Sequence, residues 1–267
     1  MMKLLKPVSV LLMLFALVIF TSCLKSEDPQ PATRYGIVTI KADMLGKTLL
    51  KNDFGDTFYV SVNSSGKNPS MIGGRAIIIY RLINEDALSN TDKKPLDIEL
   101  LSMVGITRNV SLISRDEASD SLKIKYVDPI LGFDRMVENG DSIVTGDGYI
   151  TAAIDYRFSK NITKNRFTLF RYMEDKIKPA VNGPDTLDLY LGRSADGDAE
   201  GQYKISSVAT SDPNYWPYYF FAFDVSPLIS TSYDKDAMIL RINYKKLEGD
   251  INKKVVDAVQ LVKYPTK

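Results

Sequence analysis

Histidine is absent from the 267-residue chain, and cysteine and tryptophan each occur once. Without histidine there is no Ser-His-Asp or Cys-His nucleophile site, no imidazole-ligated zinc and no imidazole proton relay. A single cysteine excludes an intrachain disulfide and a metal site built from clustered cysteines. Positive charge is not in excess, because 34 Lys and Arg stand against 33 Asp and Glu. We therefore expect no nucleic-acid partner, since phosphate backbones are bound by clustered basic residues.

The remaining composition is that of a globular protein. Hydrophobic residues make up 45% of the chain and charged residues 25%, and the length allows one large or two small domains. No motif marks a catalytic centre, because no two carboxylates are set apart for acid–base work and no serine stands in a lysine-activated motif. We therefore expect a protein that is not an enzyme, with no catalytic residues, no cofactor and no metal ligands.

Residues 1–22 form a targeting segment. Two lysines precede an apolar run that ends at Phe20, and this run has the length of a signal-peptide core rather than of a membrane span. Thr21 and Ser22 then lead to Cys23. The tetrapeptide Phe20-Thr21-Ser22-Cys23 resembles the lipobox of bacterial lipoproteins, with Phe in place of the usual Leu. The resemblance implies cleavage before Cys23 and its acylation with fatty acids such as palmitate; the alternative is an ordinary secretory signal with a chance cysteine.

The acylated cysteine and the polar residues that follow it, 23–33, are expected to form a tether. Glu27 and Asp28 resemble the acidic export signal of some Bacteroidetes lipoproteins. This resemblance implies a lipid-anchored protein of the outer membrane, with the cell surface favoured over the periplasmic face. The membrane, contacted through the lipid, is then the first expected partner.

Apolar and polar residues alternate with period two from Tyr35 onward, which is typical of half-buried β-strands. The continuous apolar run after Arg75 predicts a strand buried on both faces. The alternating segments lie around Phe58–Val62, Leu96–Leu100, Leu122–Tyr126, Leu187–Leu191 and Met238–Tyr244.

Turn sequences such as Gly146-Asp147-Gly148 separate these segments. No long amphipathic helix is expected, and only Phe133–Glu138 and Phe170–Ile177 suit a turn or two of helix. The polar stretch Ser114–Ser121 is the best candidate for a linker. These features predict an all-β protein with domains at 34–120 and 121–267.

The order of these segments resembles the NigD-like lipoproteins of Bacteroidetes. The resemblance implies an N-terminal OB-like β-barrel at 34–120, followed by a C-terminal β-sandwich at 121–267. It supplies no catalytic motif, and the histidine that members often carry before the central hairpin of the sandwich is replaced here by Arg166 or Arg171. The segments that carry the resemblance are the lipobox, the acidic tether, Gly36–Ile40, Phe58–Val62, Gly74–Tyr80, Val127–Ile130, Gly148–Ile150 and Phe221–Ser226.

The aromatic run around Trp216 is the least ordinary part of the body. From Tyr219 to Val225 its alternation predicts a core strand. Tyr215, Trp216 and Tyr218 lie in a loop-like context around a proline, so they are the candidate ligand contacts.

Acidic residues gather near Asp196, Asp198 and Glu200, with Asp185 and Asp188 close in sequence. Such oxygen ligands on a tight loop suit calcium. The segment lacks the twelve-residue loop with its closing bidentate carboxylate, and Asp-Gly also favours a solvated turn. A solvated turn is preferred, and calcium binding is left open.

Three tripeptides of the form Asp-Ser/Thr-aliphatic resemble the O-glycosylation sequence of exported Bacteroidetes proteins. They predict glycan on Ser121, Ser142 or Thr186.

These features together predict an envelope-anchored, non-enzymatic binding module whose partner is another envelope protein or a glycan. One alternative is a surface carbohydrate-binding accessory protein that uses Tyr215 and Trp216. Another, resting only on the family name, is a bacteriocin-associated, immunity-like factor.

Overall fold

The computed structural model describes residues 31–69, 74–83, 94–109, 111–114, 128–135, 141–159, 161–181, 183–196, 201–229, 237–249 and 253–265. Strands account for most of these residues. The all-β class that the period-two pattern predicted is confirmed.

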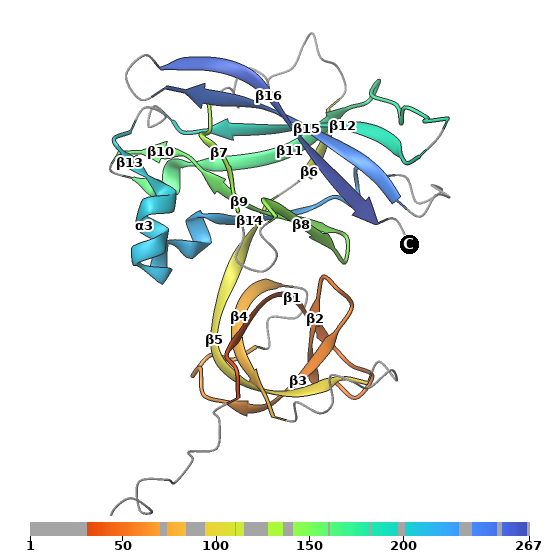
Figure 1. The fold of residues 1–267 in the computed structure, drawn as a ribbon, viewed down its shortest axis with the longest axis vertical. Coiled ribbons are helices and arrows are strands. Elements are labelled where there is room, and N and C mark those ends of the chain that lie inside the picture. Colours follow the sequence, from red (N-terminus) through yellow and green to blue (C-terminus); the bar gives the residue numbers. More distant parts are fainter. Residues whose placement is uncertain are drawn as a thin grey trace, which may run out of the picture. The chain divides into compact units, whose positions relative to one another are not determined.

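The first five strands are each paired with a neighbour on both edges. β1 pairs with β2 and β4, β3 pairs with β2 and β5, and β4 pairs with β5. Figure 1 shows these strands, red to yellow, curving around one another. Pairing on both edges is what a closed barrel requires, and the OB-like barrel stays a prediction for this part. The bounds are β1 (Arg34–Ala42), β2 (Thr48–Asn52), β3 (Thr57–Asn63), β4 (Arg75–Leu82) and β5 (Leu96–Asn109).

The burial of these strands follows the sequence pattern with one exception. Residues 75–78 of β4 are all buried, as the continuous apolar run predicted. In β3, Phe58 is 2% exposed but Val62 is 48% exposed. The register of β3 against β5 shifts between Val60 and Val62, and such an irregularity turns the following side chains to the other face.

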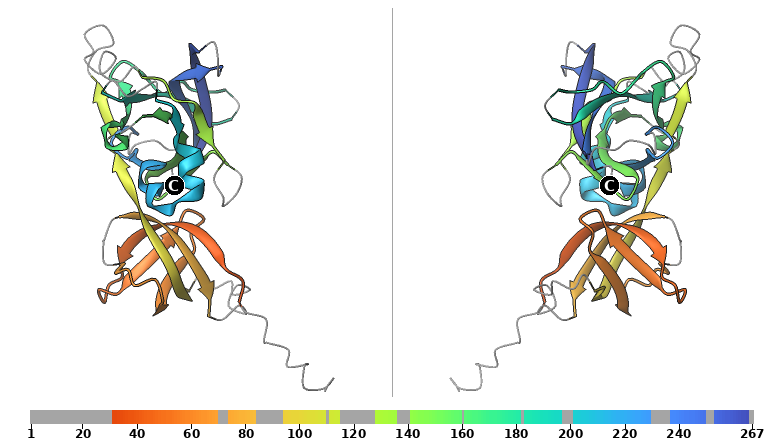
Figure 2. Two further views of the ribbon diagram at one scale, coloured as in Figure 1. Left: turned by 90° about the vertical axis from the view of Figure 1, so that its left-hand side faces the viewer. Right: turned by 90° about the vertical axis from the view of Figure 1, so that its right-hand side faces the viewer.

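A five-stranded sheet has the order β16-β15-β12-β11-β6. Figure 2 shows β15 and β16, the dark-blue pair, lying side by side over their length. The strands of this sheet are β6 (Ser111–Ser114), β11 (Arg166–Tyr172), β12 (Asp185–Ser194), β15 (Ala237–Glu248) and β16 (Lys254–Pro265).

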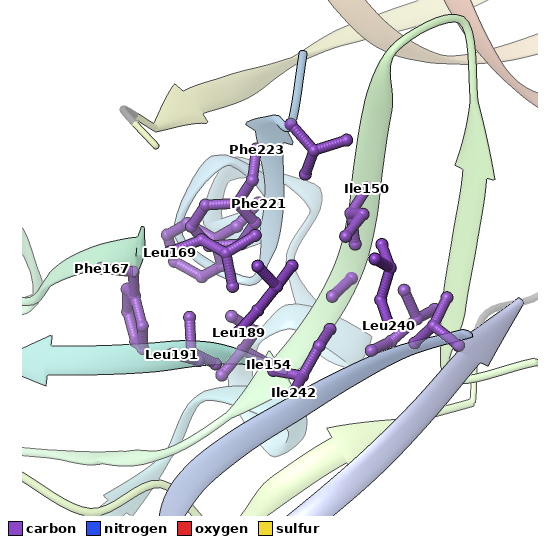
Figure 3. Packing of buried hydrophobic residues seen from close by; sticks show 14 of the residues in the cluster. Ile150, Ile154, Phe167, Leu169, Leu189, Leu191, Phe221, Phe223, Leu240 and Ile242 are labelled. Carbon is purple, nitrogen blue, oxygen red and sulfur yellow. The ribbon is translucent and has the colours of Figure 1, made fainter. Parts of the chain in front are cut away.

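The remaining strands face this sheet across the main hydrophobic core. β9 pairs with β7, β8 and β14, and β14 also pairs with the end of β5. Figure 3 shows Ile150 of β9 and Phe221 of β14 packed against the five-stranded sheet, which contributes Leu169, Leu189 and Leu240. Two sheets packed over a shared apolar core form a sandwich-like arrangement. The bounds are β7 (Gly132–Asp134), β8 (Ile143–Gly146), β9 (Tyr149–Asp155) and β14 (Phe220–Asp224), with the short pair β10 (Arg157–Phe158) and β13 (Tyr203–Lys204).

A separate hydrophobic cluster joins a first group of strands, β1–β5, to a second group formed by β7, β8, β9 and β14. It contains Ile37 and Ile77 from β1 and β4 together with Val144, Ala153 and Ala222 from β8, β9 and β14. β5 also serves both groups, because Thr107–Asn109 continue it beside β14. The two groups of strands are therefore joined by apolar packing as well as by the chain.

The short helices lie elsewhere than predicted. Phe133 belongs to β7, and Phe170 belongs to β11 between β12 and β6, where sheet pairing overrides any local helical preference. The described helices are η2 (Ile162–Lys164), α3 (Ile205–Ser211) and η3 (Pro213–Tyr218).

The expected domain boundary between residues 120 and 121 and most of the expected linker lie outside the described residues. β6, which precedes that boundary, pairs in parallel with β11 of the five-stranded sheet. Within the part that the structure describes, no helix has both the length and the apolar character needed to cross a bilayer.

Candidate functional site

The predicted lipidation residue Cys23 and the predicted glycosylation residue Ser121 lie outside the described residues. Ser142 is half-buried and immediately precedes β8. Thr186 is half-buried in β12, where its N–H donates to the carbonyl of Lys178 at 3.0 Å and its carbonyl accepts from the Lys178 N–H at 2.8 Å. Modification of these three hydroxyl residues stays a prediction.

The three predicted aromatic contacts lie together in η3. The indole Nε1 of Trp216 donates to the carbonyl of Ala209 in α3 at 3.0 Å, and the Trp216 ring meets Phe220 edge-on at 6.0 Å. Tyr215 and Tyr218 pack against the main core, and all three residues are half-buried. These contacts position the rings structurally, and their contact with a ligand stays a prediction.

The strand that follows η3 is buried, as its alternation predicted. Phe221, Phe223 and Val225 are 4%, 2% and 0% exposed and belong to the main core.

The acidic turn is only partly described. Asp196 is exposed, with a positive φ of 46°, whereas Asp198 and Glu200 lie outside the described residues. Asp185 accepts a hydrogen bond from the N–H of Ala180 at 3.0 Å, and Asp188 forms ion pairs with Lys178 and Arg241. Among the described residues, no three His, Cys, Asp or Glu side chains cluster closely enough to hold a metal ion.

A buried ion pair that was not predicted from the sequence lies at the start of β4. The Arg75 guanidinium binds both carboxylate oxygens of Asp53 at 2.6 Å, and the two side chains are 0% and 2% exposed. The guanidinium also donates to Thr39 at 2.9 Å and Thr151 at 2.8 Å and lies over the ring of Tyr149. The sequence did contain a signal for this site, since Arg75 stands at the start of an apolar strand. A guanidinium buried there requires hydrogen-bond acceptors and a negative charge nearby.

The turn between β2 and β3 is held by this ion pair and by hydrogen bonds to Asn52. Asn52 Oδ1 accepts from the N–H groups of Phe54 and Asp56 at 3.0 and 2.7 Å. Gly146 approaches the turn so closely that a Cβ there would lie 2.6 Å from the Cβ of Asp53. The neighbouring Phe54 side chain is 56% exposed on this fixed turn.

A depression with a volume of about 300 Å³ lies beside the Phe54 ring. Its lining combines polar groups of Asp141, Gln260 and Lys263 with apolar groups of Phe54 and Leu261; the remaining lining residues are Ser142, Ile143, Val144, Thr145 and Val262. β8 and β16 are joined here by a hydrogen bond from the Thr145 hydroxyl to the Lys263 carbonyl at 3.1 Å. Sequence reasoning missed this site because three segments far apart in the chain form it and none carries a motif.

A carboxylate pair lies on β7 and β9. The Tyr219 hydroxyl donates to Asp134 at 2.8 Å, and Asp155 accepts from the N–H of Ser206 in the first turn of α3 at 3.2 Å. Burial raises the pKa of Asp155, and the charge of Asp134 raises it further, whereas hydrogen bonds from Ser206 and the charge of Lys204 oppose the rise. Burial and the bond to Asp134 also raise the pKa of Tyr219. Tyr219 therefore stays protonated as a donor, and Asp155 satisfies a backbone group at the helix start.

Comparisons with known proteins show which solved structures share this fold. No protein-family model and no curated protein matches the chain. Solved structures do match it: a protein described as toxin-related from Parabacteroides distasonis has a TM-score of 0.59 at 16% identity, covering 88% of this chain and 94% of its own. A protein described as a lipoprotein from Bacteroides fragilis has a TM-score of 0.58 at 15% identity, covering 88% and 99%. A NigD-like immunity protein from Bacteroides caccae has a TM-score of 0.52 at 16% identity, covering 85% and 92%. The predicted resemblance to NigD-like proteins is thus confirmed at the level of the fold.

Proposed function

We propose that this chain is a NigD-like lipoprotein of the bacterial envelope, attached to the outer membrane through acylated Cys23. One observation carries the proposal: the only cysteine follows directly on an apolar leader, and the body has the fold of a protein described as a lipoprotein. Several acyl chains on one residue anchor firmly, because each buried methylene contributes about 0.8 kcal/mol. The acidic tether supports display at the cell surface over the periplasmic face.

The proposed activity of the body is binding without catalysis, with another envelope protein or a glycan as the partner. The absence of catalysis is supported by three buried charged side chains of the described residues, each of which is held by other groups of the fold. Arg75 is bound by Asp53 and two threonines, and Arg193 by Asn165 and two backbone carbonyls. Asp155 is bound at the start of α3.

A second candidate is an immunity-like role beside a bacteriocin. It is favoured by one specific observation, the shared fold with the NigD-like immunity protein of Bacteroides caccae. Protection of a sensitive strain by expression of this chain would distinguish it from a general binding module.

The anchor is tested by changing Cys23→Ser and fractionating cells with a detergent that separates membrane proteins from soluble ones. We expect the unaltered chain to enter the detergent phase. The variant should either enter the aqueous phase or keep its signal peptide uncleaved. Ser26→Ala, three residues along the tether, is the matched control and should partition like the unaltered chain. Cleaved Cys23→Ser protein that still enters the detergent phase would contradict the proposal.

A further inference from the structure

We infer that the depression beside Phe54 is a binding site for a neutral saccharide. The inference deepens the proposed binding function by naming the ligand class and the site, and it does not depend on the lipid anchor. It rests on the shape of the site, its charge and its rigidity.

The apolar surfaces of the depression suit the C–H face of a sugar ring. The Phe54 ring is 56% exposed and the Leu261 side chain 60% exposed, so both offer contact area at the rim. Beneath them, Ile143 and Val262 are 8% and 6% exposed and connect this surface to the core. Most of the lining is polar, and a few apolar contacts within a polar lining suit a ligand that is rich in hydroxyl groups.

The polar groups can bind several hydroxyls without selecting for charge. Asp141 supplies acceptors, Lys263 supplies donors, and Ser142 and Gln260 supply both. Among the described lining residues, one carboxylate (Asp141) and one ammonium (Lys263) balance each other, so their charges favour neither an anionic nor a cationic ligand. A volume of about 300 Å³ accommodates one or two sugar rings.

The site is held in shape before any ligand arrives. Asp53, next to Phe54, is clamped by Arg75 through two bonds of 2.6 Å, and Thr145 ties β8 to the Lys263 carbonyl of β16. Binding therefore requires little ordering of these backbone segments, which favours affinity for a small ligand.

The test is saturation-transfer NMR on the purified acylated protein in micelles of a sugar-free detergent. The probes are glucose, galactose, mannose, fucose and N-acetylglucosamine, together with glucuronic acid as a charged comparison. We expect transfer to at least one neutral sugar, strongest on its C–H protons. Phe54→Ala should weaken this binding about tenfold, the loss expected when one aromatic contact worth about 1.4 kcal/mol is removed.

Tyr35→Ala is the matched control, because Tyr35 is 47% exposed and does not line the depression. It should leave binding unchanged, whereas Asp141→Asn should weaken it. No transfer to any neutral sugar, transfer to glucuronic acid alone, or equal effects of Phe54→Ala and Tyr35→Ala would overturn the inference. None of these results affects the detergent partition of Cys23, so failure of the saccharide site and failure of the anchor are distinguishable.

Discussion

Individual charged residues in this protein are buried with different kinds of partner. Arg75 is neutralised by the carboxylate of Asp53. Arg193, which is 1% exposed, donates to the carbonyl of Pro129 at 2.6 Å and lies 4.7 Å from the centre of the Tyr156 ring. Removing a partner from such a group leaves its desolvation uncompensated, so these positions should tolerate substitution poorly.

Asp155 is expected to make stability depend on pH. Its pKa in the fold lies above the ordinary value of 3.8, chiefly because of burial, so the folded state holds its proton over a range where the unfolded state has released it. Stability from this group therefore rises as the pH falls through the raised pKa and levels off below 3.8. Asp155→Asn removes the buried charge and keeps an acceptor for Ser206, so the variant should be more stable than the unaltered chain at neutral pH. This advantage should shrink with acidification in urea titrations across pH.

Asp147→Asn is the control with the opposite sign. Burial alone would raise the pKa of Asp147, but hydrogen bonds from Lys41 and Lys51 lower it overall. Its contribution is present above 3.8 and is lost as the pH falls through the lowered pKa. Asp147→Asn should therefore be less stable than the unaltered chain at neutral pH. The same pH trend in both variants would contradict the assignment.

At the scale of elements, α3, η3 and β14 form one continuous structural unit. Asp212 ends α3 and its side chain accepts from the Asn214 N–H at 2.9 Å, which starts η3. The indole N–H of Trp216 then donates a hydrogen bond to the carbonyl of Ala209 in α3. The strand that follows, β14, lies in the core. The aromatic run therefore anchors a helical turn to the sheet.

Trp216→Ala should lower the free energy of unfolding by about 2–4 kcal/mol, somewhat less than for a fully buried tryptophan. The variant loses the ring contact with Phe220 as well as the bond to Ala209. Trp216→Phe keeps an aromatic ring and should lose about 1–2 kcal/mol. Denaturant unfolding must be followed by circular dichroism, because Trp216 is the only tryptophan. Unchanged stability together with lost glycan binding would instead favour the aromatic ligand contacts predicted from the sequence.

The sequence predicted elements better than it predicted the site. The alternation in Leu187–Leu191 identified the three buried leucines of β12 correctly, because period two indicates which face of a strand is covered. It did not predict that Asp188, on the opposite face, is also buried, at 7% exposed. Phe170 was misjudged because its conformation depends on pairing with β12 and β6. The depression could not be predicted from the sequence, because Phe54, Ser142 and Gln260 lie far apart in the chain and come together only when it folds.

At the scale of the whole body, the hydrophobic cluster that contains Ile77 and Ala222 links the two groups of strands. The Arg75 network adds polar contacts across the same region, since Asp53 precedes β3 and Thr151 lies in β9. Because apolar and polar contacts both join β1–β5 to β7, β8, β9 and β14, we expect these two groups of strands to unfold in one cooperative transition.

Arg75→Met tests this coupling. It leaves the Asp53 carboxylate buried without its guanidinium, so the free energy of unfolding should fall by about 3–5 kcal/mol. The double variant Arg75→Met/Asp53→Leu should recover part of the loss, because a buried ion pair can often be replaced by apolar groups. Lys41→Met removes an ion pair whose lysine is 40% exposed, so this control should lose no more than about 1 kcal/mol.

Two probes decide whether the groups unfold together. Circular dichroism reports all strands, whereas the fluorescence of Trp216 reports the packing of η3 against β14. For a coupled body the two denaturation curves should coincide in the unaltered chain and should shift together in Arg75→Met. If Arg75→Met advanced only part of the dichroism change and left the Trp216 transition in place, the two groups would be independent. The Arg75 network would then stabilise β1 to β5 alone.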